Sequence, residues 1–115
     1  MKLTEKVYSE LYDLPIQIVD QRGLTSLDIR AKARKIKATC PNLGLVVIDY
    51  LQLIRPAEND KYKSWALQVG DIVRELRDLA GEINVPIILL SQLNRGVESR
   101  DNKRPMMSDL RDSGN

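Results

Sequence analysis

An uninterrupted apolar run occupies residues 43–48 at the centre of the chain, and an acid, Asp49, follows it. A run without polar alternation is typical of a strand buried on both faces, as in the parallel sheet of an α/β protein. Residues 85–90 form a second such run, in which Pro86 is tolerable only at the entrance of the strand. The sequence therefore predicts two buried strands.

The segments before the first of these strands predict helices. Leu3, Val7 and Leu11 lie four residues apart and predict a helix over 3–12, which Pro15 stops. Residues 16–19 alternate like a strand. Thr25 begins a capping-box pattern with an acid three residues later, so a second helix is expected over 25–39.

A third helix is expected from Ser64, after a polar loop over 55–63. It has an apolar stripe at steps of three and four residues, formed by Trp65, Val69, Ile72, Val73, Leu76, Leu79, Ala80 and Ile83. Strand, helix and strand make a crossover unit, which predicts two parallel strands in one sheet with right-handed connection. The apolar stripes predict a small three-layer α/β unit.

Two side chains that could take part in binding or catalysis would meet at the carboxyl edge of this sheet, where open α/β sheets bind ligands. Asp49 ends the first strand. P-loop NTPases hold Mg²⁺ with a carboxylate at the same kind of position, at the end of a hydrophobic strand. Asp is also a common turn residue after a strand, so the pattern allows both interpretations. Gln92 follows the second strand. It could orient a water molecule or sense a terminal phosphate, or be a hydrogen-bonded strand cap.

The composition of the chain limits the kinds of protein and of functional site that it can represent. The chain has 115 residues, so it is one small domain or a piece of a larger one, and its net charge of +2 does not by itself indicate a nucleic-acid binder. It has no His and one cysteine, Cys40, which argues against a catalytic thiol and a Cys/His zinc site. No signal peptide or membrane-spanning run is present, which favours the cytoplasm and no membrane partner.

Several charged segments allow more than one interpretation. The bases of the second helix could contact DNA or another subunit, but solvated charges on an amphipathic helix explain them as well. Residues 95–104 are charged and without an apolar face, so we expect them to be mobile. Residues 108–114 predict a short capped turn with exposed backbone donors, which together with Arg111 could hold a phosphate, or an ordinary frayed terminus.

Three motifs in collinear order carry a resemblance to a known family. They are Asp-Tyr-Leu-Gln-Leu at 49–53, Leu-Ser-Gln-Leu-Asn-Arg at 90–95 and Arg-Pro-Met-Met-Ser-Asp-Leu-Arg-Asp-Ser-Gly at 104–114. With these motifs, most of the chain resembles the bacterial replicative DNA helicases of the DnaB type.

The resemblance implies a partial RecA-like P-loop NTPase fold, with a parallel sheet flanked by helices, over residues 1–115. In such helicases this is the central part of a motor domain that uses ATP and Mg²⁺, moves along single-stranded DNA and assembles as a homo-oligomeric, hexameric ring, with other replication proteins as candidate partners. By the same resemblance Asp49 (a Walker B acid) serves the metal, Gln92 couples the nucleotide site to DNA, and Arg111, Asp112 and Gly114 face the DNA backbone. Asp112 stands where the family usually has Glu.

Other parts of such a motor are not found in this sequence. None of the six glycines is followed by Lys, so there is no phosphate loop, and the catalytic glutamate and arginine-finger segments of the family are also absent. We therefore expect a helicase fragment that is inactive by itself. The alternative is a non-catalytic DNA-binding or assembly module derived from a RecA-like motor. A recombinase-type ATPase shares the strand-ending acid, but the motifs at 90–95 and 110–114 argue against it.

Overall fold

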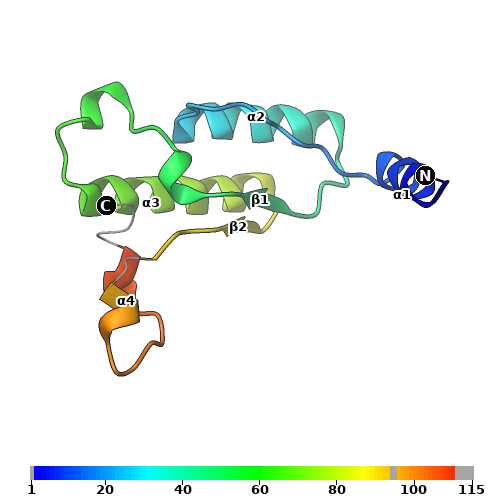
Figure 1. Cartoon of the computed structure of the whole chain (residues 1–115). Coiled ribbons are helices and arrows are strands. Elements are labelled where there is room, and N and C mark those ends of the chain that lie inside the picture. The colour runs from blue at the N-terminus through cyan, green and yellow to red at the C-terminus, as the bar shows by residue number, and fades with distance from the viewer. Residues whose placement is uncertain (1, 94–95, 111–115) are drawn as a thin grey trace.

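The computed structural model of the chain describes residues 2–93 and 96–110 (Figure 1). Along the chain the helices and strands are α1 (Lys2–Tyr12), α2 (Ser26–Thr39), β1 (Val46–Ile48), α3 (Trp65–Ile83), β2 (Ile87–Leu89) and α4 (Gly96–Ser99). Short 3-10 turns occupy Leu51–Leu53, Glu58–Asp60 and Met107–Leu110. The predicted α/β class is confirmed.

The two strands form a parallel sheet, as predicted from the crossover unit. The register pairs Val46 with Ile87, Val47 with Ile88 and Ile48 with Leu89. Pro86 lies just before β2, and its carbonyl accepts a hydrogen bond from the Val46 N–H at 3.0 Å. Its missing N–H therefore removes no bond from the ladder, as expected for a proline at a strand entrance.

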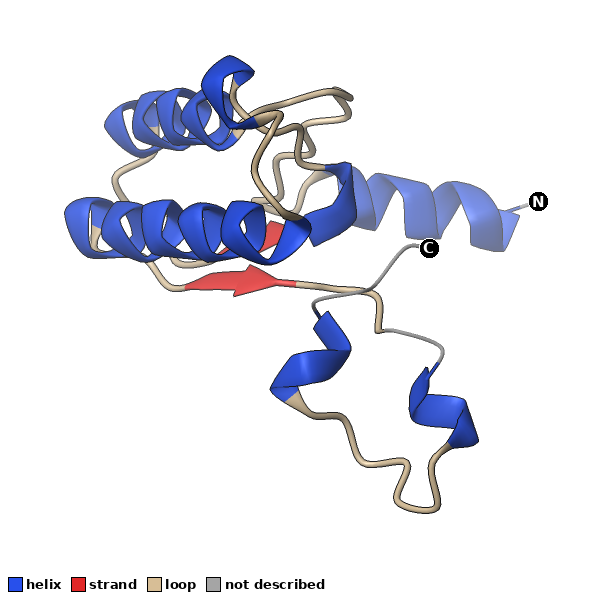
Figure 2. Ribbon diagram, turned by 90° about the vertical axis from the view of Figure 1, so that its left-hand side faces the viewer, coloured by secondary structure: helices blue, strands red, loops and turns tan. Residues whose placement is uncertain are grey.

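Only one face of this sheet is covered by described residues, which corrects the prediction of burial on both faces and of three layers. Four strand residues, Val46, Ile48, Ile87 and Leu89, pack against the core cluster that α2 and α3 build with the loops around them. Val47 and Ile88, on the opposite face, are 54% and 47% exposed. Figure 2 shows α3 along the strands, with α2 beside it. An apolar run signals that burial is favourable, but not which segment supplies the cover.

The two central helices begin at the positions that the sequence predicts, and each start is capped by a side chain. Thr25 Oγ1 accepts from the Asp28 N–H at 3.2 Å, and Asp28 Oδ2 accepts from the Thr25 N–H at 2.9 Å, which completes the capping box of α2. Ser64 caps α3, and Asn84 ends it in the left-handed conformation at a φ of 54°. Between them, α3 contributes the completely buried Leu79 to the core.

The N-terminal part of the chain is a helix without a partner among the described residues. The helix predicted over 3–12 is confirmed as α1, which projects away from the sheet in both views (Figures 1 and 2). Every side chain over 3–23 is exposed, including Ile18 at 85%. The strand predicted at 16–19 is wrong for this structure, because no described segment forms a β-ladder with its backbone groups.

The charged segment after β2 has more structure than its sequence predicts. It contains α4 and is followed by the 3-10 turn Met107–Leu110, and Val97 of α4 is buried with an exposed fraction of 9%. The expectation that this segment has no apolar anchor is therefore wrong. Its hydrogen bonds, described below, also give no support to the mobility predicted from that expectation.

Candidate functional site

The carboxyl edge of the sheet brings together the two side chains that the sequence singles out. Asp49 directly follows β1 and is exposed, and its peptide bond to Tyr50 is cis. Gln92 lies three residues beyond the end of β2. Because β1 and β2 are parallel, both residues leave the sheet at the same end. The predicted convergence of Asp49 and Gln92 on one edge is confirmed, whereas their chemical roles stay predictions.

Asp49 offers a single carboxylate to a cation. Within residues 2–93 and 96–110, no group of three or more His, Cys, Asp or Glu side chains is placed to hold a metal ion. An all-protein metal cage is therefore not formed by the described residues. One exposed acid at a sheet edge nevertheless fits Mg²⁺, which usually takes one or two carboxylates and completes its shell with water and phosphate oxygens.

A third residue of this edge, Gln52, was missed by the sequence reasoning. Its Nε2 donates to the Gln92 carbonyl at 3.1 Å and to Ser91 Oγ at 3.2 Å, while its Oε1 accepts from the Gln92 N–H at 3.2 Å. Gln52 is half-buried in the 3-10 turn Leu51–Leu53, three residues after Asp49. The signal in the sequence was only its place in the first motif, because hydrogen bonds across 40 residues leave no local pattern.

Gln92 thus has a bonded main chain and an exposed side chain. Its N–H and its carbonyl are both held by Gln52, and the carbonyl also accepts from Ser91 Oγ at 3.0 Å. Among the described residues, the side-chain amide of Gln92 makes no hydrogen bond and the residue is exposed. The strand-capping contacts seen here come from Gln52, and the Gln92 amide faces solvent.

A partly buried ion pair organises the segment that leads to the third motif. Arg100 donates from Nη1 and Nη2 to the two carboxylate oxygens of Asp109, at 2.7 and 3.0 Å, in the bidentate geometry that makes such pairs strong. The Met106 N–H also donates to Asp109, at 2.7 Å, and Asp109 is only 5% exposed. The Arg100 guanidinium, followed by the Met106 N–H, holds the pKa of Asp109 below its usual range.

The end of this segment is tied to α3. Trp65, the first residue of that helix, donates from Nε1 to the Leu110 carbonyl at 3.3 Å. The short turn predicted near residue 108 is confirmed as the 3-10 turn Met107–Leu110. The predicted DNA-facing residues, Arg111, Asp112 and Gly114, lie outside the described residues.

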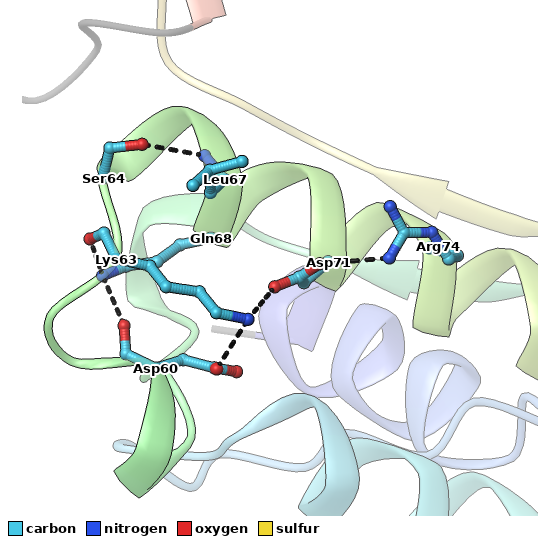
Figure 3. Close-up of polar contacts among 7 residues, drawn as sticks. All are labelled: Asp60, Lys63, Ser64, Leu67, Gln68, Asp71 and Arg74. Carbon is cyan, nitrogen blue, oxygen red and sulfur yellow. Dashed lines mark hydrogen bonds and ion pairs between the residues drawn. The ribbon is translucent and has the colours of Figure 1, made fainter.

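The loop over 55–63 is joined to α3 by charged and polar contacts (Figure 3). Lys63 Nζ lies 2.9 Å from carboxylate oxygens of both Asp71 and Asp60. The hydrogen bond to Asp71, and then that to Asp60, raises the pKa of Lys63, and the same contact lowers the pKa of Asp71. Gln68 Nε2 donates to the Asp60 carbonyl at 3.1 Å and to the Lys63 carbonyl at 2.9 Å. This network is structural, because it links a loop to the helix that follows it.

The bases of α2, for which a DNA or subunit contact was one interpretation, are partly used inside the chain. Arg30 and Arg34 both pair with Glu82 of α3, and the Arg34 contact does most to lower the pKa of Glu82. Lys37 donates to the Pro41 carbonyl at 2.7 Å. These contacts favour the structural interpretation of the basic helix. In the described part of the chain, we find no helix with the length and apolar character needed to cross a membrane.

Comparison with known proteins identifies the class to which this α/β unit and its edge belong. The profile of the DnaB-like helicase C-terminal domain matches residues 1–115. The chain therefore belongs to the DnaB-like helicase C-terminal domain family, and the resemblance noted from its motifs is confirmed.

Individual relatives agree with this assignment. The replicative DNA helicase DnaB of Mycobacterium intracellulare is 47% identical over 106 residues, which cover 92% of this chain and 18% of that protein. The replicative DNA helicase DnaC of Bacillus subtilis is 50% identical over 99 residues, which cover 86% of this chain and 21% of that protein. The chain thus spans about a fifth of the length of these relatives.

Solved structures show the same arrangement of the chain. One solved ATPase domain superposes with a TM-score of 0.84 at 41% identity, over 96% of this chain and 38% of that one. A DnaB-like replicative helicase, solved to describe its interactions with primase, gives a TM-score of 0.83 at 41% identity, over 96% of this chain and 27% of that one. The described α/β unit therefore matches part of a DnaB-like ATPase domain.

Proposed function

We propose that this chain is the central part of a RecA-like motor domain in an ATP-dependent replicative DNA helicase, which unwinds duplex DNA by moving along single-stranded DNA. The observation that carries the proposal is the parallel strand pair that brings Asp49 and Gln92 to one edge. Membership of the DnaB-like family supports it. The phosphate-loop and arginine-finger segments would come from other parts of a longer protein, because the chain matches only 18% and 21% of its named relatives.

In this proposal Asp49 is the acid that serves Mg²⁺. It is exposed directly after a strand, so the sheet fixes the backbone while the carboxylate stays accessible. When bound with ATP, Mg²⁺ would neutralise negative charge that develops on the phosphates. The task of Asp49 would be to hold the metal at the sheet edge, where its negative charge is the property that matters.

Gln92 would act by orientation, since its side chain carries no charge. It would couple the nucleotide site to DNA, because a residue at this edge can respond to the terminal phosphate. The support is its geometry: the main chain of Gln92 is fixed by Gln52, while its amide is exposed.

Arg111, Asp112 and Gly114 are proposed to contact the DNA backbone, on the strength of the third motif. Such contacts hold the strand without reading its bases. The two residues before Arg111 support this role, since Asp109 is paired with Arg100 and the Leu110 carbonyl is held by Trp65. The chain would enter the DNA-facing motif from a fixed position.

The proposed assembly is a homo-oligomeric, hexameric ring in the cytoplasm. Primase is a candidate partner, because the DnaB-like replicative helicase of the solved structure interacts with primase. Primase is not needed to test the chemistry of the sheet edge, because that chemistry can be measured as nucleotide turnover.

The proposed role of Asp49 can be tested by Asp49→Asn in the intact helicase that carries this segment. The substitution keeps the shape and removes the charge, so ATP turnover should fall on the order of 100-fold with or without single-stranded DNA, as when one electrostatic contact to a transition state is lost. Asp78→Asn, which changes an exposed acid on α3, is the matched control and should leave turnover unchanged. The 115-residue chain alone should show no turnover.

Equal activity of Asp49→Asn and wild type would contradict the proposed metal role. ATP turnover by the isolated chain that Asp49→Asn abolishes would contradict the need for a phosphate loop from elsewhere. DNA binding without any turnover in the intact protein would instead favour the non-catalytic module.

A further inference from the structure

Main-chain pairing between the two strands stops just beyond the edge. The last main-chain bonds run from the Leu90 N–H to the Ile48 carbonyl at 3.0 Å and from the Leu51 N–H to the Leu90 carbonyl at 2.7 Å. After that point the first strand turns into the 3-10 turn Leu51–Leu53. Its backbone therefore no longer runs beside residues 91 and 92.

The side chain of Gln52 takes the place of the missing strand. A primary amide presents one donor and one acceptor side by side, as a peptide group does. Gln52 uses Nε2 toward the Gln92 carbonyl at 3.1 Å and Oε1 toward the Gln92 N–H at 3.2 Å. Two such bonds to one residue fix both the position and the rotation of its backbone.

A third contact makes the arrangement specific for glutamine. Nε2 of Gln52 also lies 3.2 Å from Ser91 Oγ, which itself donates to the Gln92 carbonyl at 3.0 Å. Glutamate at this position would have no donor and would place a carboxylate against the Gln92 carbonyl oxygen. Asparagine would be shorter by one methylene group. Methionine would keep the length without either polar function.

We propose that Gln52 is a positioning residue, which holds Gln92 in register with Asp49 and so sets the direction of the Gln92 side chain. The proposal rests on the function proposed above for Gln92. Gln52 follows Asp49 by three residues and lies in the 3-10 turn that begins at Leu51, so one short segment carries the metal acid and the group that orients Gln92. It would not touch nucleotide or DNA.

The consequence is a defined pattern of kinetic effects. Loss of the Gln52 amide should lower turnover through Gln92, and it should leave the KM for ATP nearly unchanged because Asp49 keeps its place after β1. Gln92→Ala removes the side chain on which Gln52 acts. Once that side chain is gone, loss of Gln52 should cost little more, which is the non-additivity expected of two residues in one unit.

The experiment measures kcat and KM for ATP, with and without single-stranded DNA, in the intact helicase carrying this segment. The variants are Gln52→Met, Gln92→Ala and the double variant. Gln68→Met is the matched control, because Gln68 also clamps two backbone carbonyls, those of Asp60 and Lys63, but in the loop before α3. Thermal unfolding of each variant shows whether it is folded.

We expect Gln52→Met to lower the DNA-stimulated kcat by about tenfold, the lower end of the effect of a lost orienting contact in metal sites. KM should stay within about twofold, the double variant should match Gln92→Ala, and Gln68→Met should keep wild-type stimulation. If Gln52→Met does not fold, Gln52→Asn provides the same comparison with the amide retained but out of reach.

Two results would overturn the inference while the proposed function stands. One is wild-type kinetics for Gln52→Met together with impaired Gln92→Ala. The other is a double variant in which the two losses multiply, since Gln52 would then act independently of Gln92. Wild-type kinetics for Gln92→Ala, or no DNA-stimulated turnover in the wild type, would overturn the proposed function itself and the inference with it.

Discussion

The sheet edge and the segment over 96–110 are close in the chain but are held by different interactions. The edge is held by main-chain hydrogen bonds, by the amide of Gln52 and by apolar packing, in which Leu51 is 1% exposed. The segment over 96–110 depends on the Arg100–Asp109 ion pair and has one buried apolar side chain, Val97, among its described residues. The contacts described at the edge involve no charged group, whereas the neighbouring segment is held by an ion pair that acid can loosen.

The largest effect is expected where apolar packing supports the edge. Leu79→Ala should lower the free energy of unfolding of the chain by about 2–5 kcal/mol, because it opens a cavity at a completely buried position. Leu67→Ala is the control in the same helix, at a position 60% exposed, and should change that free energy by at most about 0.5 kcal/mol. Urea unfolding followed by circular dichroism measures both. Equal losses would show that α3 does not support the edge in the way described.

A smaller, local effect is expected from Arg100→Ala. Asp109 would lose both guanidinium bonds and would be held less firmly. The Met106 N–H, which donates a hydrogen bond to Asp109, should therefore become roughly tenfold less protected from hydrogen exchange. The N–H of Leu90 at the edge should be unaffected. Arg74→Ala is the control, since Arg74 pairs with Asp71 on an exposed face of α3. A comparable loss at Leu90 would mean that the two regions are one cooperative unit.

Low pH should loosen the segment over 96–110, with a smaller loss of hydrogen-exchange protection than Arg100→Ala causes. Because the pKa of Asp109 is lowered on folding, its stabilising contribution is full above the unfolded pKa of about 4 and is lost as the pH falls through the lower folded pKa. Protection of the Met106 N–H, corrected for intrinsic exchange rates, should therefore be constant from about pH 7 to pH 5 and fall below about pH 4. Asp109→Asn should remove this step. Identical acid profiles for wild type and Asp109→Asn would contradict it.

Local patterns were enough to predict α1, α2, α3, the two paired strands and the convergence of Asp49 and Gln92. Capping residues such as Thr25 and Ser64 act within one turn, and a crossover unit constrains the direction of its strands. The motifs in turn predicted the family, which the match over residues 1–115 confirmed.

The features that were not predicted depend on partners far away in the sequence or missing from the described residues. Gln52 bonds to Gln92 across 40 residues, and Arg100 selects Asp109 among several nearby acids. The exposed face at Val47 and the unpaired segment at 16–19 depend on which segment covers or pairs with them. An apolar run or an alternating pattern indicates that burial or pairing of a segment is favourable, but it does not identify the segment that covers or pairs with it.

The central claim is that the edge shared by Asp49 and Gln92 couples nucleotide hydrolysis to DNA, and Gln92→Ala in the intact helicase tests it most directly. Nucleotide affinity and turnover are measured with and without single-stranded DNA. We predict nearly unchanged affinity together with weakened hydrolysis or weakened stimulation by DNA. Wild-type behaviour of Gln92→Ala in all four measurements would contradict it.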